Sequence, residues 1–144
     1  ITINASDNDG NAATTVSSTF TIDTVPPTLT ISSPAAGLIT NKAALNVIGK
    51  TNDATSSPIT LTMTLNGTSL GTVTVGSDGS FTKAVTLAEG TNSIVVTAKD
   101  GAGQTTSITL SVKLDTTVPE LKGITLSPNP VSTSASVAIT VEVS

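Results

Sequence analysis

The stretch that determines the fold is Ile59–Asp100, ITLTMTLNGTSLGTVTVGSDGSFTKAVTLAEGTNSIVVTAKD. From Ile59 to Leu65, apolar side chains alternate with threonines. A period of two is typical of a β-strand with one buried and one solvated face. Asn66-Gly67 follows, and this dipeptide is the strongest short signal for a β-hairpin. The stretch therefore predicts a series of antiparallel strands.

The same pattern continues on both sides of this stretch. Turn-forming residues at 76–79, 89–90 and 100–103 separate further rows of apolar side chains, and the last row ends at Leu114. Strands near Thr28–Ile31 and Leu45–Ile48 open the series. Seven short strands, spaced roughly 8–12 residues apart, are typical of an all-β sandwich. Both phenylalanines, Phe20 and Phe81, are expected to face inward.

The chain contains an internal repeat. INASDNDGN at Ile3–Asn11 matches VTAKDGAGQ at Val96–Gln104, and IDTVPPTL at Ile22–Leu29 matches LDTTVPEL at Leu114–Leu121. The two matches indicate a period of about 92 residues. We therefore predict the last strands of one repeat in residues 1–24, a complete repeat in 25–116, and the first strands of a third in 117–144.

Composition excludes several kinds of chemistry. Among 144 residues there are six lysines and 10 acidic residues, a net charge of −4, and no Cys, His, Arg, Trp or Tyr. Disulfides, zinc sites, thiol nucleophiles and histidine triads are thereby excluded. We expect no enzyme activity, and no nucleic-acid binding without arginine or stacking aromatics. No apolar run approaches the roughly 18 residues of a membrane-spanning helix, so no membrane insertion is expected.

Acidic residues recur at equivalent places in the repeats, since Asp7 matches Asp100 and Asp23 matches Asp115. In a sandwich, we expect the loop before the last strand and the linker after it to lie at the same end, which lets these carboxylates converge at the junction between repeats. Calcium binds six to eight oxygen ligands, several of them carboxylates. The sequence therefore makes a calcium site possible at each junction between repeats.

The candidate ligands form two sets. The first junction offers Asp7, Asp9, Asn11 and Asp23, and the second offers Asp100, Gln104 and Asp115. The spacing Asp7-x-Asp9-Gly10-Asn11 resembles the start of a calcium loop without the distal Glu of an EF-hand. The alternative interpretation is a plain turn, because Asp and Asn side chains bond nearby backbone amides without any metal.

VTAKDGAGQTTSITLSVKLDTTVPEL (Val96–Leu121) resembles the end-and-linker motif of bacterial immunoglobulin-like tandem repeats in large surface proteins. That motif has an Asp-x-x-Gly-Asn hairpin and an Asp-Thr-x-x-Pro linker, and Gln104 departs from its Asn. Residues 66–100 resemble the variety related to the glucodextranase B domain, with its Gly-x-Asp-Gly-x-Phe turn. The resemblance implies tandem immunoglobulin-like β-sandwiches in a protein that is secreted or on the bacterial cell surface. In some giant adhesins of this kind, the matching aspartates bind calcium between repeats. The resemblance therefore also implies calcium at Asp7, Asp23, Asp100 and Asp115.

The repeats suggest three functions. A stalk or spacer of a surface protein or adhesin follows from the period and from linkers stiffened by Pro26, Pro27 and Pro119. A self-assembling filament is the alternative, because the predicted partial repeats have open sheet edges that could exchange strands with neighbouring copies in a homopolymer. A ligand-binding adhesin module would need an exposed aromatic or charged patch, and the sequence predicts none.

Overall fold

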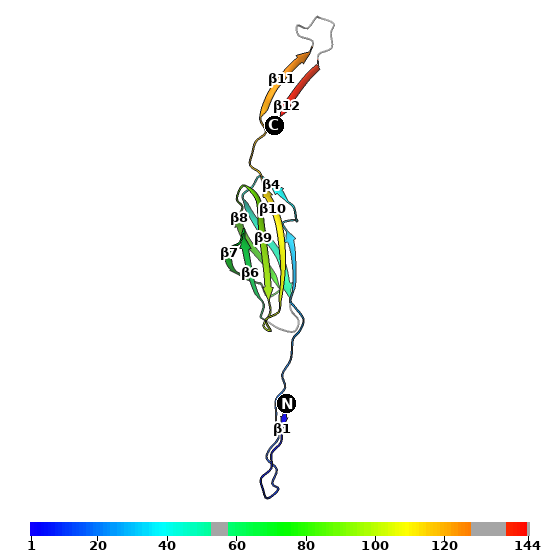
Figure 1. Ribbon diagram of the computed structural model, residues 1–144, viewed down its shortest axis with the longest axis vertical. Coiled ribbons are helices and arrows are strands. Elements are labelled where there is room, and N and C mark those ends of the chain that lie inside the picture. Colours follow the sequence, from blue (N-terminus) through cyan, green and yellow to red (C-terminus); the bar gives the residue numbers. More distant parts are fainter. Residues whose placement is uncertain (53–57, 128–137, 144) are drawn as a thin grey trace.

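The computed structural model describes residues 1–52, 58–127 and 138–143, and their regular elements are β-strands. A central two-layer sandwich has a strand hairpin beyond each of its ends (Figure 1). One layer is a five-stranded sheet with the order β4 (Ile39–Thr40), β10 (Thr105–Leu114), β9 (Gly90–Lys99), β6 (Thr60–Leu65) and β7 (Thr68–Val73). The other layer contains β3 (Thr28–Ser33), β5 (Ala44–Asn52) and β8 (Ser80–Thr86). The predicted all-β sandwich is confirmed.

The hairpins at the two ends are two-stranded sheets. Their strands are β1 (Thr2–Ile3) with β2 (Val16–Ser17), and β11 (Leu121–Ser127) with β12 (Ala138–Val143). The division of the chain into repeats at 1–24, 25–116 and 117–144 stays a prediction. Within the described residues, no helix is long and apolar enough to cross a membrane.

The core lies between the two sheets and follows the predicted alternation. Met63 on β6 and Val96 on β9 are buried, whereas the threonines that alternate with them face outward or lie at the margin. Phe81 on β8 is 3% exposed, which confirms its inward position. Phe20 is 67% exposed, so its predicted inward position is wrong. Phe20 follows β2 in a segment without strand structure, and among the described residues no second sheet covers it.

The sandwich has one strand that the sequence pattern did not predict. After β3 the chain crosses to the other sheet, where β4 pairs in parallel with the end of β10. The pairing register joins Ile39 with Lys113 and Thr40 with Leu114. A two-residue strand shows no alternation, and the side chain of Ile39 is 66% exposed, so the sequence carried no signal for it.

Phe81 packs directly over a glycine on the neighbouring strand. Gly49 and Phe81 are register partners in the β5–β8 pair. A Cβ atom at Gly49 would lie 2.6 Å from Cζ of Phe81 and 2.2 Å from the carbonyl oxygen of Thr30. The aromatic ring thus fills the space that a side chain would occupy, and only glycine fits beneath it.

A fully buried amide joins two turns of the sandwich. Asn92 is 0% exposed, and its Oδ1 accepts hydrogen bonds from the backbone N of Ala88 (2.9 Å) and from Nδ2 of Asn66 (3.0 Å). Its Nδ2 donates to the carbonyl oxygens of Ala88 (2.7 Å) and Gly90 (3.0 Å). Asn66 has a φ of 52° and Gly67 a φ of 80°, as the predicted Asn-Gly hairpin requires. Asn92 therefore holds the β6–β7 hairpin against the turn between β8 and β9.

Candidate functional site

The segment that leads into the sandwich, residues 23–27, is called the incoming linker below. Thr106 Oγ1 at the start of β10 donates a hydrogen bond to the carbonyl oxygen of Pro27, and Pro27 is fully buried. Nε2 of Gln104 donates to the carbonyl oxygen of Asp23 over 3.4 Å. The incoming linker is therefore attached to the β9–β10 hairpin of the sandwich that follows it.

Asp100 lies in the turn of that hairpin and is 5% exposed. Its Oδ1 accepts a hydrogen bond of 2.8 Å from the backbone N of Gln104. Its Oδ2 is buried, and no described residue donates a hydrogen bond to it. One carboxylate oxygen of Asp100 thus stabilises the turn, while the other has no hydrogen-bond donor among the described residues.

Asp23 shows the same arrangement on the incoming linker. Its Oδ1 accepts a hydrogen bond of 3.0 Å from the backbone N of Val25, and its Oδ2 is buried without a donor from the described residues. Gln104 contacts both aspartates, Asp100 through its backbone N and Asp23 through its side chain. Gln104 therefore links two aspartates that each have a buried carboxylate oxygen without a donor from the described residues.

The predicted grouping of Asp100 with Asp115 is wrong. Asp100 precedes β10 and Asp115 follows it, so the ten residues of the strand separate them. At about 3.3 Å per residue, the strand places the two aspartates roughly 30 Å apart. In a sandwich, the hairpin before the last strand lies at the end where the chain arrives, and the linker after that strand lies at the end where the chain leaves.

The grouping of Asp7 and Asp9 with Asp23 fails for the same reason. Asp7 and Asp9 lie at the tip of the β1–β2 hairpin, whereas Ser18 closes its other end by a bond from its backbone N to the carbonyl oxygen of Ile1 (3.0 Å). Asp23 follows Ser18 in the chain, and its carbonyl oxygen accepts a hydrogen bond from Gln104 of the sandwich. The structure therefore places Asp23 with Asp100 and Gln104, a combination that the sequence reasoning missed. The general order of strands in a sandwich was the signal that could have identified it.

The tip of the β1–β2 hairpin has the hydrogen bonds of a turn. Oδ1 of Asp7 accepts from the backbone N of Asp9 (3.0 Å) and of Asn11 (2.8 Å), and Oδ2 accepts from Nδ2 of Asn11 (2.9 Å). These bonds, that from the Asn11 side chain first, lower the pKa of Asp7 below its usual value. The residues that the structure describes contain no group of three or more acidic side chains able to hold a metal ion. Calcium binding by Asp7, Asp9, Asn11, Asp23, Asp100 or Asp115 stays a prediction.

The outgoing linker, residues 115–119, is also held by the sandwich. The carboxylate of Glu89 accepts two hydrogen bonds from Thr116. The backbone N of Thr116 donates over 3.2 Å, and the hydroxyl of Thr116 donates over 2.8 Å. Oδ2 of Asp115 pairs with Nζ of Lys113 at 2.9 Å. The hydrogen bond from Lys113 is the main reason that the pKa of Asp115 is lowered. Glu89 and Thr106, which hold the two linkers, were not identified from the sequence.

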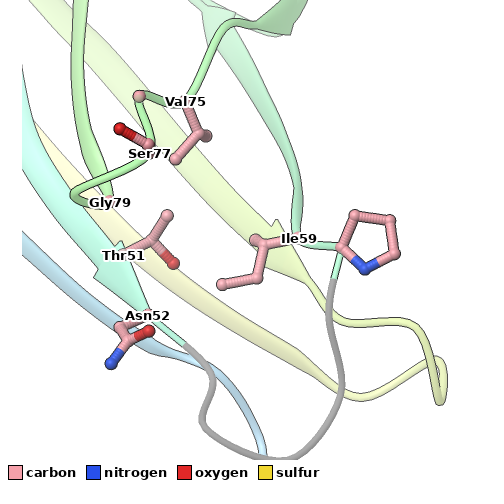
Figure 2. Close-up of a pocket in the computed structure, with 8 residues that line it drawn as sticks. Thr51, Asn52, Ile59, Val75, Ser77 and Gly79 are labelled. Atoms are coloured by element: carbon pink, nitrogen blue, oxygen red, sulfur yellow. The ribbon is translucent and has the colours of Figure 1, made fainter.

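A pocket of about 270 Å³ lies between the end of β5 and the turn before β8. Figure 2 shows Thr51 and Asn52 at the end of β5 on one side of the pocket, and Val75 and Ser77 on the segment before β8 on the other. None of its eight lining residues is acidic or basic. The pocket thus offers hydroxyl, amide and aliphatic contacts.

Comparison with known families identifies the sandwich. The model of the family described as "Glucodextranase, domain B" matches residues 27–116, more than half of the chain. The chain belongs to this family. As a member of the glucodextranase domain B family, it contains an immunoglobulin-like sandwich, a structural module of a multidomain protein. No curated protein matches it.

Two solved structures show the same fold. The fibronectin(III)-like modules of Clostridium thermocellum CbhA are 17% identical, with a TM-score of 0.52 over 79% of this chain and 60% of theirs. The endo-beta-1,4-mannanase from Thermotoga petrophila is 13% identical, with a TM-score of 0.54 over 65% of this chain and 20% of its own. This domain B family member thus spans less than two thirds of either structure, and the likeness shows the fold alone.

Proposed function

We propose that this chain is a non-enzymatic spacer, a stalk segment of an extracellular repeat protein such as a bacterial surface protein or adhesin. The observation that supports it is the arrangement of the two linkers. The incoming linker meets the sandwich at the Asp100 end of β10, and the outgoing linker leaves at the Asp115 end. Modules joined in this way follow one another in a line, and the ten residues of β10 contribute about 33 Å to each step.

Attachment of both linkers supports stiffness, which a spacer requires. Thr106 and Gln104 hold the incoming side, and Glu89 holds the outgoing side. Proline at 26, 27 and 119 further restricts the backbone there. A flexible tether would not extend in proportion to the number of modules, because a random coil grows only with the square root of its length.

Small-angle X-ray scattering of the chain tests the spacer. We expect an elongated monomer whose linkers loosen when Thr106→Val removes the donor to Pro27 and Glu89→Ala removes the acceptors for Thr116. Thr109→Val is the matched control, since Thr109 is an exposed threonine of the same strand. A compact particle, or equal flexibility in the double variant, the control and the parent, would refute the spacer.

The filament remains the second candidate, because both terminal hairpins expose apolar side chains. Ile1 and Ile3 on one hairpin are 76% and 66% exposed, and Ile139 and Val141 on the other are 65% and 53% exposed. Strand exchange between neighbouring copies would cover these faces. Sedimentation velocity separates the two candidates: a monomer supports the spacer, and large assemblies that grow with concentration support the filament.

A further inference from the structure

The five-stranded sheet has an unpaired edge along the first half of β10. On one side, β10 pairs with β9 along all ten of its residues. On the other side, β4 pairs only with Lys113 and Leu114, and the backbone N of Gly37 donates to the carbonyl oxygen of Ser111 (2.9 Å). No described residue forms a backbone hydrogen bond with this side of residues 105–109, which are called the open edge below.

The hydrogen bonds near β4 show which backbone groups of the open edge point away from β9. The backbone N of Lys113 donates to the carbonyl oxygen of Leu38 (2.8 Å), on the side away from β9. Successive residues of an antiparallel strand direct their backbone groups to opposite sides, so the other odd-numbered residues of β10 do the same. Thr105, Ser107 and Thr109 therefore present their N–H and C=O groups to solvent, and their side chains are exposed as well.

The other edges of the two sheets have features that hinder pairing with another chain. On β8, Lys83 lies in the row that faces the core, opposite Val47, which is 0% exposed. β3 and β7 each contain a register shift of the bulge type, and β4 has only two residues. Inward-pointing charges, bulges and very short edge strands are all known to protect sheet edges.

The open edge has none of this protection. The pairing of β10 with β9 has no register shift. Between Asp100 and Lys113 the sequence contains neither a charged residue nor a proline. A regular, uncharged edge with free backbone groups is a template for strand addition.

We propose that the open edge pairs with the same edge of a second copy of this chain, antiparallel and with a two-fold axis at Ser107. In that register Ser107 faces Ser107 of the second copy, and Thr105 faces Thr109 of the second copy. Each such pair exchanges two backbone hydrogen bonds, so the three pairs form about six. A two-fold contact uses the same surface on both partners, so it closes at a dimer.

The distribution of charge favours a second copy as the partner. Each chain has a net charge of −4, so two copies repel each other over most of their surfaces. The open edge is uncharged, and pairing it with itself places no like charges opposite each other. Both edges also present the same three residues, so every N–H group meets a C=O group. The contact is short, which makes it a weak, transient one.

The inference goes beyond the spacer and does not depend on it. It joins two chains side by side in opposite directions, the orientation of stalks that project from facing surfaces. Elongated chains that never pair would refute the contact and leave the spacer intact, whereas dimers of compact chains would do the reverse. A filament built through the terminal hairpins would instead grow beyond dimers.

Sedimentation equilibrium of the whole chain tests the contact. We expect a monomer at about 10 µM and a dimer at about 1 mM, as for other weak interfaces. Amide hydrogen exchange should be slower for Ser107 and Thr109 at the higher concentration, because their N–H groups gain acceptors only in the dimer.

Two substitutions at the axis should remove the dimer and keep the fold. Ser107→Lys places two lysines directly opposite each other and should raise the dissociation constant at least about tenfold. Ser107→Pro removes an N–H group that β9 does not use, and edge strands tolerate proline at such positions. Thr62→Lys is the matched control: Thr62 is exposed in the same row of the sheet, joined through Thr97, but lies on the interior strand β6.

Three results would overturn the proposal. The first is a monomer at every concentration up to about 1 mM. The second is a dimer that neither Ser107→Lys nor Ser107→Pro weakens, or that Thr62→Lys weakens equally. The third is association without slower exchange at Ser107 and Thr109, which would assign the contact to another surface.

Discussion

Asn92→Ala tests whether one buried amide organises the end of the sandwich where the β6–β7 hairpin meets the turn before β9. The substitution removes four hydrogen bonds, two made by Oδ1 and two by Nδ2, at distances of 2.7 to 3.0 Å. At about 1 kcal/mol net for each bond, the free energy of unfolding should fall by about 4 kcal/mol. Domains of this size are stable by only about 5–15 kcal/mol, so the loss is a large share of the total.

Urea denaturation followed by far-ultraviolet circular dichroism is the suitable assay, because the chain has no Trp or Tyr for fluorescence. Asn46→Ala is the matched control: Asn46 is exposed on β5, and its loss should change the free energy of unfolding by less than about 0.5 kcal/mol. A loss below about 1 kcal/mol for Asn92→Ala, or one equal to the control, would show that water replaces the amide and would refute the reasoning.

Three further substitutions test the core and the surface charges. Phe81→Ala should lower the free energy of unfolding by about 3–5 kcal/mol in the same assay, and a loss under 1 kcal/mol would contradict a buried ring. Gly49→Ala should destabilise the chain too, because its Cβ would lie 2.6 Å from Phe81, and unchanged stability would contradict that contact. The hydrogen bond from Ser80 is the main reason that the pKa of Asp78 falls from 3.8 to about 2. The ionised carboxylate of Asp78 therefore contributes fully to the free energy of unfolding above about pH 4, and this contribution is lost as the pH falls towards 2. Asp78→Asn should make the free energy of unfolding less dependent on pH in this range. An unchanged pH dependence would show that Asp78 does not contribute.

The local pattern of the sequence was sufficient to predict most strands of the sandwich. Alternation from Ile59 to Leu65 specified both the strand and its buried face, because a period of two leaves only one arrangement that keeps threonine in water. Asn66-Gly67 specified the hairpin, because both residues adopt the positive φ that its turn requires. Phe20 shows the limit of the pattern, since an apolar residue is buried only where a second layer covers it.

The candidate site could not be predicted in the same way. The sequence pattern indicated Asp23 and Asp100 as candidate ligands, yet it grouped each with residues close to it in the chain. Burial of one oxygen of each carboxylate depends on the linker packing against a hairpin about 80 residues later. No local pattern contains that contact.

By itself, the sequence determined the all-β class and the absence of thiol and imidazole chemistry, because these depend on residue type and on short-range alternation. Only the tertiary structure decided which ends meet. The order of strands in the sandwich places the incoming linker beside the β9–β10 hairpin and sends the outgoing linker to the far end of β10. Pro27 and Thr106, which are distant in sequence, thereby become hydrogen-bond partners.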